Sequence, residues 1–290
     1  MIDTQTQKTL DPTQLVAWAL QEDAPNGDIT SDAFIRTDAT GNAHITAKAS
    51  GTFFGSPIIA SFKTLTPEIT FTLHVADGDA ITAGQRVLSM TGPFHALLGI
   101  ERVLLNLLQR FCGISTMTQK YINALSDPKI HVMETRKTTP LWRQWEKAAV
   151  CAGGGTNHRN DLSDMVLIKE NHLSHLKETK RFEQLAQLLK ECRQKFPDKK
   201  IEIEVETLEQ VETFPLELVD IVMLDNFSIL DIGKASHILK KRGISIPVEV
   251  SGNVTLSTIL QYRGLPIQRI SVGALTHSVV ALDLSMRFHD

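Results

Sequence analysis

The stretch METRKTTPLWRQWEKAAVCAGGGTNHRNDLSDMVLIKENH, residues 133–172, decides the fold of this chain. An apolar run at each end, 130–133 and 165–168, is followed at once by charged side chains. If both runs are parallel strands of one sheet, the charged groups after them meet at one edge, where a small, multiply anionic ligand could bind. The basic and imidazole side chains of the stretch are Arg136, Lys137, His158, Arg159, Lys169 and His172.

The same unit of apolar run, polar tip and helical segment recurs to the end of the chain. The further runs are IEIEV (201–205), IVML (221–224), VEV (248–250) and ISV (270–272). Strand–helix alternation predicts parallel strands with right-handed crossovers. Polar groups directly after every strand favour an open α/β barrel, TIM-like, of about six parallel strands. A doubly wound sheet is the alternative, but no GxGxxG follows a first strand, which disfavours a dinucleotide-binding version.

Carboxylates predict a metal site within this barrel. Glu202, Glu204 and Glu206 alternate with apolar residues, so they share one face of a strand. In a barrel that face points inward, where carboxylates need cations or a metal as partners. Asp225 follows the next apolar run at the same height. A carboxylate of this strand together with Asp225, near an anionic ligand, implies Mg²⁺, directly bound or held through water.

Two turns of small residues are candidate phosphate sites. Ser251-Gly252-Asn253 precedes one predicted helix and Gly273-Ala-Leu-Thr another. Backbone N–H groups and the helix dipole make such turns suitable for phosphate. The triple glycine at 153–155 is expected to end a helix.

The first part of the chain has a different pattern. Asp11 and Pro12 predict a helix start, with the helix running to about Gln21 and a loop at 22–31. Glycine-punctuated alternation over 41–92 predicts short antiparallel strands.

An apolar helix is expected from Pro93, buried between layers or subunits. A buried Arg102 would need a partner, either a ligand anion or Glu101. A break is predicted at Gly113, with a second helix from about Thr116 to Ala124.

Composition narrows the functional classes. The net charge of −3 and the 6% aromatic residues give no reason to expect nucleic-acid binding. No apolar run approaches the ~18–20 residues of a membrane span, and no secretory signal is recognised. Cys112, Cys151 and Cys192 form no CxxC, which indicates packing residues in a reducing cytoplasm. His172 and His175 are interpreted as a solvated pair rather than a metal site.

Nine segments, read together, resemble the nicotinate-nucleotide pyrophosphorylase family, the decarboxylating quinolinate phosphoribosyltransferases of NAD biosynthesis. In family order they cover about residues 15–288. They are EDAPNGDITS, ERVLLNLLQ, ETRKTTP, GGGTNHR, LIKENH, EIEVE, MLDNF, SGNV and SVGALTH.

The resemblance implies both architecture and reaction. Residues 1–113 with 276–290 would form an N-terminal α/β sandwich domain rejoined by the C-terminal tail, and 114–275 the barrel. The reaction would be phosphoribosyl transfer from phosphoribosyl pyrophosphate to quinolinate with decarboxylation, giving nicotinate mononucleotide, pyrophosphate and CO₂. The chain would act as a homodimer in the cytoplasm, with Mg²⁺ as cofactor.

The resemblance also implies residue roles. The quinolinate carboxylates would be bound by Arg136, Arg159 and Lys169 with His158 alongside, and by Arg102 of the partner subunit. Lys137 would bridge towards phosphoribosyl pyrophosphate, and Glu204 and Asp225 would face its ribose and Mg²⁺. The 5′-phosphate would be seated by Ser251, Gly252, Asn253 and Gly273.

Two loops depart from the family pattern. ProGlyLeuArg is replaced by Pro140-Leu141-Trp142-Arg143, and HisArgLeuGly by His158-Arg159-Asn160-Asp161. The main cationic residues remain in both, so the departures concern loop shape and substrate fit rather than reaction type.

Other functions remain open from the residues alone. A Schiff-base barrel lyase would use Lys169 as nucleophile, but it would leave the arginines and carboxylates without a role. A related phosphoribosyltransferase could act on another pyridine acceptor, or the chain could be a family member attached to metal transport. A non-catalytic module would bind the ligands without turnover.

Overall fold

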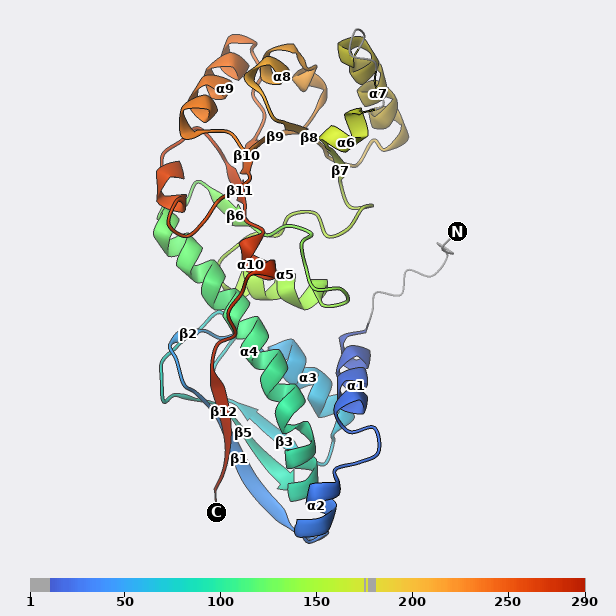
Figure 1. Ribbon diagram of the computed structural model, residues 1–290, viewed down its shortest axis with the longest axis vertical. Coiled ribbons are helices and arrows are strands. Elements are labelled where there is room, and N and C mark those ends of the chain that lie inside the picture. The colour runs from blue at the N-terminus through green and yellow to red at the C-terminus, as the bar shows by residue number, and fades with distance from the viewer. Residues whose placement is uncertain (1–10, 175, 177–180, 290) are drawn as a thin grey trace. The chain divides into compact units, whose positions relative to one another are not determined.

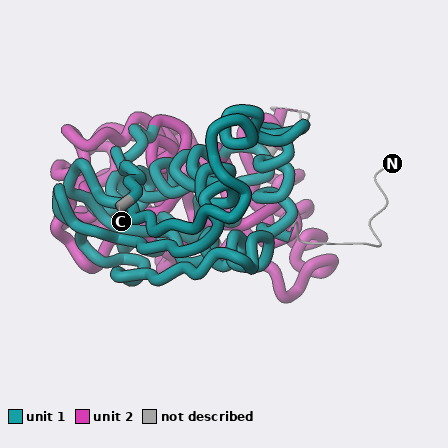
Figure 2. Tube along the Cα trace, turned by 90° about the horizontal axis from the view of Figure 1, so that it is seen from below, with its two compact units in different colours: residues 1–119, 139–154, 279–290 teal, residues 120–138, 155–278 magenta. Residues whose placement is uncertain are grey.

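The computed structural model describes residues 11–174, 176 and 181–289. The chain divides into two compact units (Figure 2). The first contains the residues through 119, 139–154 and those from 279 onward. The second contains residues 120–138 and 155–278. Each unit is described below by itself.

The first unit is built on an antiparallel sheet that the C-terminal tail completes. Its order is β12 (Leu284–His289), β1 (Thr40–Ala47), β5 (Arg86–Pro93) and β3 (Thr70–Leu73). A second, two-stranded sheet pairs β2 (Gly51–Thr52) with β4 (Ala80–Ile81). Alternate residues of β1 are buried, so one face of the sheet forms the core. The predicted β-rich region and the returning tail are confirmed.

The helices α1, α2 and α3 belong to this unit (Figure 1). The predicted α1 (Pro12–Asp23) is capped by Asp11, whose carboxylate accepts from the backbone N–H of Thr13 at 2.9 Å. The predicted loop at 22–31 is wrong in part, because Asp28 caps α2 (Ile29–Phe34). Helix α3 (Ser56–Leu65) was missed within the region read as strands. It begins with proline in its first turn and buries Ile58, Ile59 and Phe62, a spacing typical of a helix.

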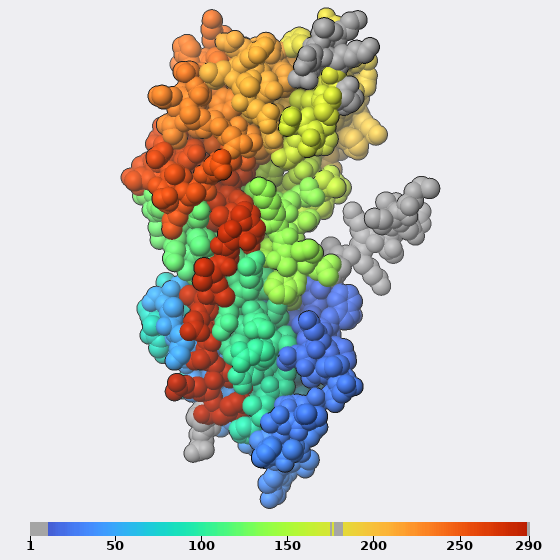
Figure 3. Space-filling model, in the orientation of Figure 1, coloured from blue at the N-terminus to red at the C-terminus, as the bar shows by residue number. Residues whose placement is uncertain are grey.

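A single long helix, α4 (Phe94–Leu125), corrects the predicted break at Gly113. Glycine costs a helix interior only about 1 kcal/mol relative to alanine, so it need not end one. A Cβ on Gly113 would lie 3.2 Å from the Cα of Ala281 and closer still to the carbonyl oxygen of Val280. Gly113 is therefore required for close packing of the C-terminal tail, which lies along α4 (Figure 3).

Helix α4 also corrects the expected burial of Arg102. Its apolar side, including Leu97, Leu104 and Leu108, is fully buried. Arg102 and Asn106, four residues apart, are instead exposed, so the helix keeps one polar stripe.

Helix α5 (Arg143–Ala152) follows the loop at 140–143 that differs from the family pattern. Gly153 caps its C-terminal end, as predicted. Leu141, where the family pattern has glycine, has φ = 70° and is 59% exposed. A side chain in this left-handed region is strained by about 1–2 kcal/mol.

Replacing Leu141 with glycine is expected to raise the free energy of unfolding by up to about 1 kcal/mol, because the relief of backbone strain exceeds the entropy cost of glycine. Leu162 is also exposed but has no positive φ, so Leu162→Gly is the matched control. Chemical denaturation of both variants should show a gain only for Leu141→Gly. Equal losses in both would contradict strain at Leu141.

The second unit contains six parallel strands, as predicted. Their order is β6 (His131–Met133), β11 (Arg269–Ser271), β10 (Val248–Ser251), β9 (Ile221–Asp225), β8 (Ile201–Val205) and β7 (Val166–Ile168). The edge strands β6 and β7 do not pair within the described residues, so the barrel is open. Thr156 instead donates its backbone N–H to the carbonyl of Val132 at 2.9 Å, so the loop after α5 runs beside β6.

Helices connect strands β7 to β10 on the outside of the sheet (Figure 1). They are α6 (Glu170–Leu173), α7 (Arg181–Lys195), α8 (Leu208–Thr213) and α9 (Ile229–Lys241), with 3₁₀ turns at Leu216–Leu218 and Ile259–Tyr262. The short helix α10 (Ala274–His277) follows the strand β11. Strands β8 to β10 are buried on nearly every residue, as expected of a covered parallel sheet. Within the described part of the chain, no helix has both the length and the apolar character that a membrane crossing needs.

Candidate active site

A cavity of about 360 Å³ opens where the parallel strands end. The end of every strand contributes to it, and all its lining residues belong to the second unit. They are Thr135, Arg136, Lys137, His158, Arg159, Leu167, Lys169, Glu204, Met223, Asp225, Ser251 and Ser271. Most predicted site residues are therefore brought together. Gly252, Asn253, Gly273 and Arg102 are not among the lining residues.

Two guanidinium groups dominate one part of the lining. Arg136 and Arg159 are both half-buried. Burial lowers the pKa of Arg159, and the positive charge of Arg136 lowers it further. Arg159 donates from Nη1 to the carbonyl oxygen of Met165 at 3.2 Å, which fixes its direction. Two cations held close enough to repel each other favour an anionic ligand between them.

Lys169, the residue before α6, is ion-paired with Glu204 of β8. The Glu204 side chain is only 9% exposed, so the pair lies in a partly desolvated position. An ammonium group held by a carboxylate remains a cation and is a poor nucleophile. This geometry favours a charge-binding role for Lys169 over a Schiff base.

Three carboxylates gather beside Lys169. Oxygen atoms of Glu204, Glu206 and Asp225 lie within 4.8 Å of one another. Burial raises the pKa of Glu206, and the neighbouring carboxylates Glu170, Glu204 and Asp225 raise it further. Clustered carboxylate oxygens that repel one another fit a hard divalent cation such as Mg²⁺. Glu206 was noted on this face but was not predicted as a ligand.

The turn after β10 lies next to this acid group. The helix predicted to follow this turn is wrong, because in the described chain only the 3₁₀ helix Ile259–Tyr262 lies between β10 and β11. Ser251 pairs in register with Asp225, and Gly252 and Asn253 follow with φ of 93° and 52°. Asn253 donates from its side-chain amide to Oδ1 of Asn226 at 3.1 Å. A Cβ on Gly252 would lie 2.9 Å from the backbone nitrogen of Asn226, so only glycine fits here.

The loop that carries Lys137 is fixed from two sides. The carbonyl of Lys137 accepts from the Thr276 hydroxyl at 2.9 Å, and its N–H donates to the Thr135 hydroxyl at 3.1 Å. A Cβ on Gly273 would lie 3.2 Å from Cδ of Lys137. The turn at Gly273 therefore leaves room for this lysine side chain, which is exposed at the cavity.

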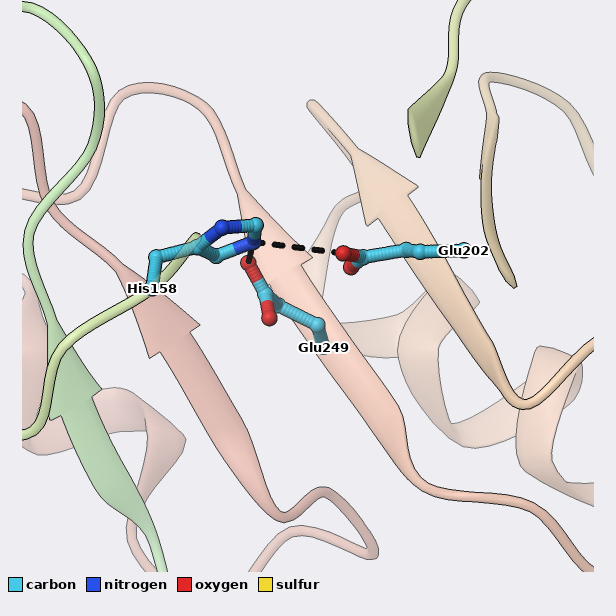
Figure 4. Close-up of side chains that lie close together, drawn as sticks. All are labelled: His158, Glu202 and Glu249. Carbon is cyan, nitrogen blue, oxygen red and sulfur yellow. Dashed lines mark ion pairs between the residues drawn. The ribbon is translucent and has the colours of Figure 1, made fainter. Parts of the chain in front are cut away.

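Beneath the cavity, His158 lies between two buried carboxylates (Figure 4). Its Nε2 is 3.2 Å from Oε2 of Glu202 and 3.2 Å from Oε1 of Glu249. Both glutamate side chains are completely buried. Burial alone lowers the pKa of His158, but Glu202 and Glu249 outweigh it and raise that pKa to about 9. Burial also raises the pKa of Glu202. Both shifts mean that the cluster keeps one more proton at neutral pH than separated residues would.

Some predicted residues lie elsewhere. Arg102 is exposed on α4 in the first unit. Cys151 is exposed, which corrects its reading as a packing residue, whereas Cys112 is buried and burial raises its pKa to about 12. His172 is exposed and its Nδ1 accepts from the N–H of Lys169 at 2.9 Å. Its expected partner, His175, lies outside the described residues.

Sequence reasoning missed several residues that build the site. Glu134 and Glu249 are fully buried, and Ser271 donates its hydroxyl to Glu249. Glu249 was visible as the charged residue of the apolar run VEV, and a charge within such a run could have indicated an inward-facing partner.

Comparisons with known proteins cover most of the chain. The family model described as quinolinate phosphoribosyl transferase, N-terminal domain, matches residues 28–112, and that of the C-terminal domain matches residues 114–287. A Bacillus subtilis (strain 168) protein named probable nicotinate-nucleotide pyrophosphorylase (carboxylating) is 39% identical over 270 residues, covering 91% of this chain and 89% of its own. A Nicotiana tabacum protein named quinolinate phosphoribosyltransferase (decarboxylating) 2b, mitochondrial, is 34% identical and covers 96% of this chain and 82% of its own.

Solved structures match over nearly the whole chain. NadC from Streptococcus pyogenes has a TM-score of 0.86 at 38% identity and covers 96% of each chain. The nicotinate-nucleotide pyrophosphorylase from Francisella tularensis has a TM-score of 0.87 at 31% identity and covers 98% of each chain.

Proposed function

Because this chain belongs to the quinolinate phosphoribosyltransferase family, we infer that it is a decarboxylating pentosyltransferase of NAD biosynthesis and propose that the barrel cavity is its catalytic site. The reaction joins quinolinate to the phosphoribosyl group of phosphoribosyl pyrophosphate and yields nicotinate mononucleotide, pyrophosphate and CO₂. One observation carries the site assignment: cations and carboxylates from separate strand ends converge on one cavity.

Quinolinate binding is assigned to the cationic part of the cavity. The ligand carries two carboxylates, and Arg136, Arg159 and Lys169 offer positive charges at half-buried positions. Guanidinium groups can bind carboxylates through two parallel hydrogen bonds, which also orients the ring. Repulsion between Arg136 and Arg159 is relieved when a dianion enters, so binding is favoured further.

Phosphoribosyl pyrophosphate is assigned to the other part. The turns at Ser251-Gly252-Asn253 and at Gly273 are suited to its 5′-phosphate, and Lys137 to its pyrophosphate. Glu204 and Asp225, with Glu206 nearby, would hold Mg²⁺. When bound, this ion would neutralise negative charge on the pyrophosphate.

The chain's own residues then position and polarise the reactants. As the bond from the ribosyl carbon to pyrophosphate breaks, that carbon becomes oxocarbenium-like, and Glu204 or Asp225 stabilises the positive charge. Lys137 stabilises the departing oxygen. The pyridine nitrogen forms the new bond to the ribosyl carbon. The cationic ring then accepts the electron pair left when the 2-carboxylate departs as CO₂, and a proton replaces it. Catalysis comes from positioning and electrostatics, without a protein nucleophile.

The assembly we propose is a homodimer. Arg102 is exposed on α4, which makes its side chain accessible to a second copy of the chain. In the proposal, Arg102 of the partner subunit completes the set of cations around quinolinate. The cytoplasm remains the proposed location, in keeping with three free cysteines.

A direct assay tests the reaction. Purified protein incubated with quinolinate, phosphoribosyl pyrophosphate and Mg²⁺ should release nicotinate mononucleotide and CO₂ in equal amounts. Absence of both products from protein with an intact circular-dichroism spectrum rejects the catalytic assignment. A panel of other pyridine carboxylates tests an alternative acceptor. Reductive trapping by borohydride tests the lyase, for which the pairing of Lys169 with Glu204 predicts no adduct.

Replacing Gly252 with alanine should raise the KM for phosphoribosyl pyrophosphate by roughly 10–100-fold, because the new Cβ displaces Asn226 and distorts the phosphate turn. The KM for quinolinate should change much less. The matched control is Gly233→Ala in α9, where a Cβ meets nothing within 4 Å. Steady-state kinetics at saturating cosubstrate measure both constants, and equal behaviour of the two variants would remove Gly252 from the phosphate site.

A further inference from the structure

We propose that His158 is a positioning residue that fixes Arg159 for quinolinate, rather than a ligand of the substrate itself. The proposal deepens the proposed function and rests on it. His158 lines the cavity, yet its side chain is only 6% exposed. The contacts of its ring and of its backbone decide which of these two roles it can perform.

The Nε2 side of the ring faces the barrel interior. Glu202 is the second residue of β8 and Glu249 the second residue of β10, with β9 between them. Their carboxylates approach Nε2 from two directions at 3.2 Å each (Figure 4). Glu249 is itself held by the Ser271 hydroxyl and by Arg269, whose Nη1 lies 3.6 Å from Oε2. The ring edge is therefore attached to two strands of a rigid sheet.

The Nδ1 side of the ring faces the backbone of the next residue, Arg159. The backbone N–H of Arg159 donates to Nδ1 at 2.7 Å. An amide N–H can only donate, so Nδ1 is its acceptor here, and Nε2 is the ring nitrogen that faces the carboxylates. With both ring nitrogens directed at protein groups, the ring has no N–H to offer to quinolinate.

The backbone on the other side of His158 is fixed too. Its N–H donates to Oε1 of Glu134 at 3.1 Å, and Glu134 is fully buried at the end of β6. Residues 158 and 159 are thus tied to β6, β8 and β10 across the open side of the barrel. From this anchored backbone the Arg159 side chain reaches the cavity, with Nη1 bound to the carbonyl of Met165. A displacement near 1 Å in such a group can cost about 100-fold in rate.

A pair of near-isosteric variants separates the two nitrogens. In His158→Asn the side-chain oxygen can replace Nδ1 as acceptor for the Arg159 N–H. In His158→Gln the amide can instead reach Glu202 and Glu249, and the Arg159 N–H loses its acceptor. We expect the amide hydrogen of Arg159 to exchange faster in His158→Gln than in wild type, and to stay protected in His158→Asn. This readout needs no substrate, so it remains valid if the assay finds no turnover.

A double-mutant cycle tests the functional claim. Each of His158→Gln and Glu249→Gln should raise the KM for quinolinate by about 10–100-fold and leave the KM for phosphoribosyl pyrophosphate within about threefold. Glu249 is fully buried and cannot touch ligand, so its variant acts through the groups that Glu249 contacts, which are His158, Ser271 and Arg269. In an Arg159→Gln background, adding His158→Gln should raise the KM for quinolinate by no more than about twofold, because the group that His158 positions is already lost.

Three outcomes overturn the proposal. They are additive effects of His158→Gln and Arg159→Gln, normal quinolinate kinetics in Glu249→Gln, and unchanged exchange at the Arg159 amide in His158→Gln. Circular dichroism and thermal unfolding establish that each variant is folded. If wild type itself forms no nicotinate mononucleotide, the proposed function fails, and the exchange experiment alone decides the role of His158.

Discussion

Replacing Arg159 with glutamine is expected to raise the quinolinate concentration for half-maximal rate by roughly 30-fold to several thousand-fold. This range corresponds to the ~2–5 kcal/mol lost when one partner of a desolvated charge pair is removed. Arg159 is half-buried, lines the cavity together with Arg136 and donates from Nη1 to the carbonyl oxygen of Met165. Glutamine is uncharged and shorter than arginine, so it cannot replace the charge of Arg159 or extend as far into the cavity. Initial rates over a range of quinolinate, at saturating phosphoribosyl pyrophosphate and Mg²⁺, measure the effect.

The control for this prediction is an arginine of the same unit outside the cavity. Arg193 forms an ion pair with Asp220 at 2.6 Å and does not line the catalytic cavity. Arg193→Gln should therefore keep the quinolinate requirement of wild type. A normal requirement in Arg159→Gln would remove Arg159 from the quinolinate site.

Stability should depend on pH through His158. Its pKa is raised from 6.5 to about 9 in the folded chain. The resulting stabilisation is fully present below pH 6.5 and is lost as pH rises through 9, because between these values the folded chain holds a proton that the unfolded chain has already released. At 1.36 kcal/mol per unit, the loss attributable to this cluster is roughly 3 kcal/mol.

Chemical denaturation between pH 6.5 and 9.5 measures this loss, and His158→Gln supplies the reference. Other groups titrate in the same range, so the informative quantity is the difference between the two proteins. Wild type should lose about 3 kcal/mol more than His158→Gln over this interval. Parallel pH profiles would show that Glu202 and Glu249 do not keep the extra proton.

The barrel was predictable because its strands repeat a local pattern. Each apolar run of three to five residues became a parallel strand within one residue of its expected limits, from β6 at 131–133 to β11 at 269–271. Gly113 was predicted to break a helix, and the residues of α3 were predicted to be strands; both predictions were wrong for a physical reason. Whether glycine ends a helix depends on what packs against it, and for Gly113 that is the tail at Val280 and Ala281, more than 160 residues later.

The site residues were predictable where they come directly after the end of a strand. Arg136, Lys169, Glu204 and Asp225 could be assigned to one edge because parallel strands align their C-terminal ends. Asn226 could not be assigned in this way, since its contact with Gly252 and Asn253 joins two separate turns.

The sequence by itself determined the order of the parallel strands, the chemical character of their ends and the family of the chain. Only the tertiary structure decided which buried charges neutralise each other. Glu202 and Glu249 lie 44 and 91 residues after His158 along the chain, yet their carboxylate oxygens lie 3.2 Å from its Nε2. Hydrophobic periodicity specifies that a strand is buried but not which polar atoms face each other across a barrel, because that depends on register and on the path of a loop.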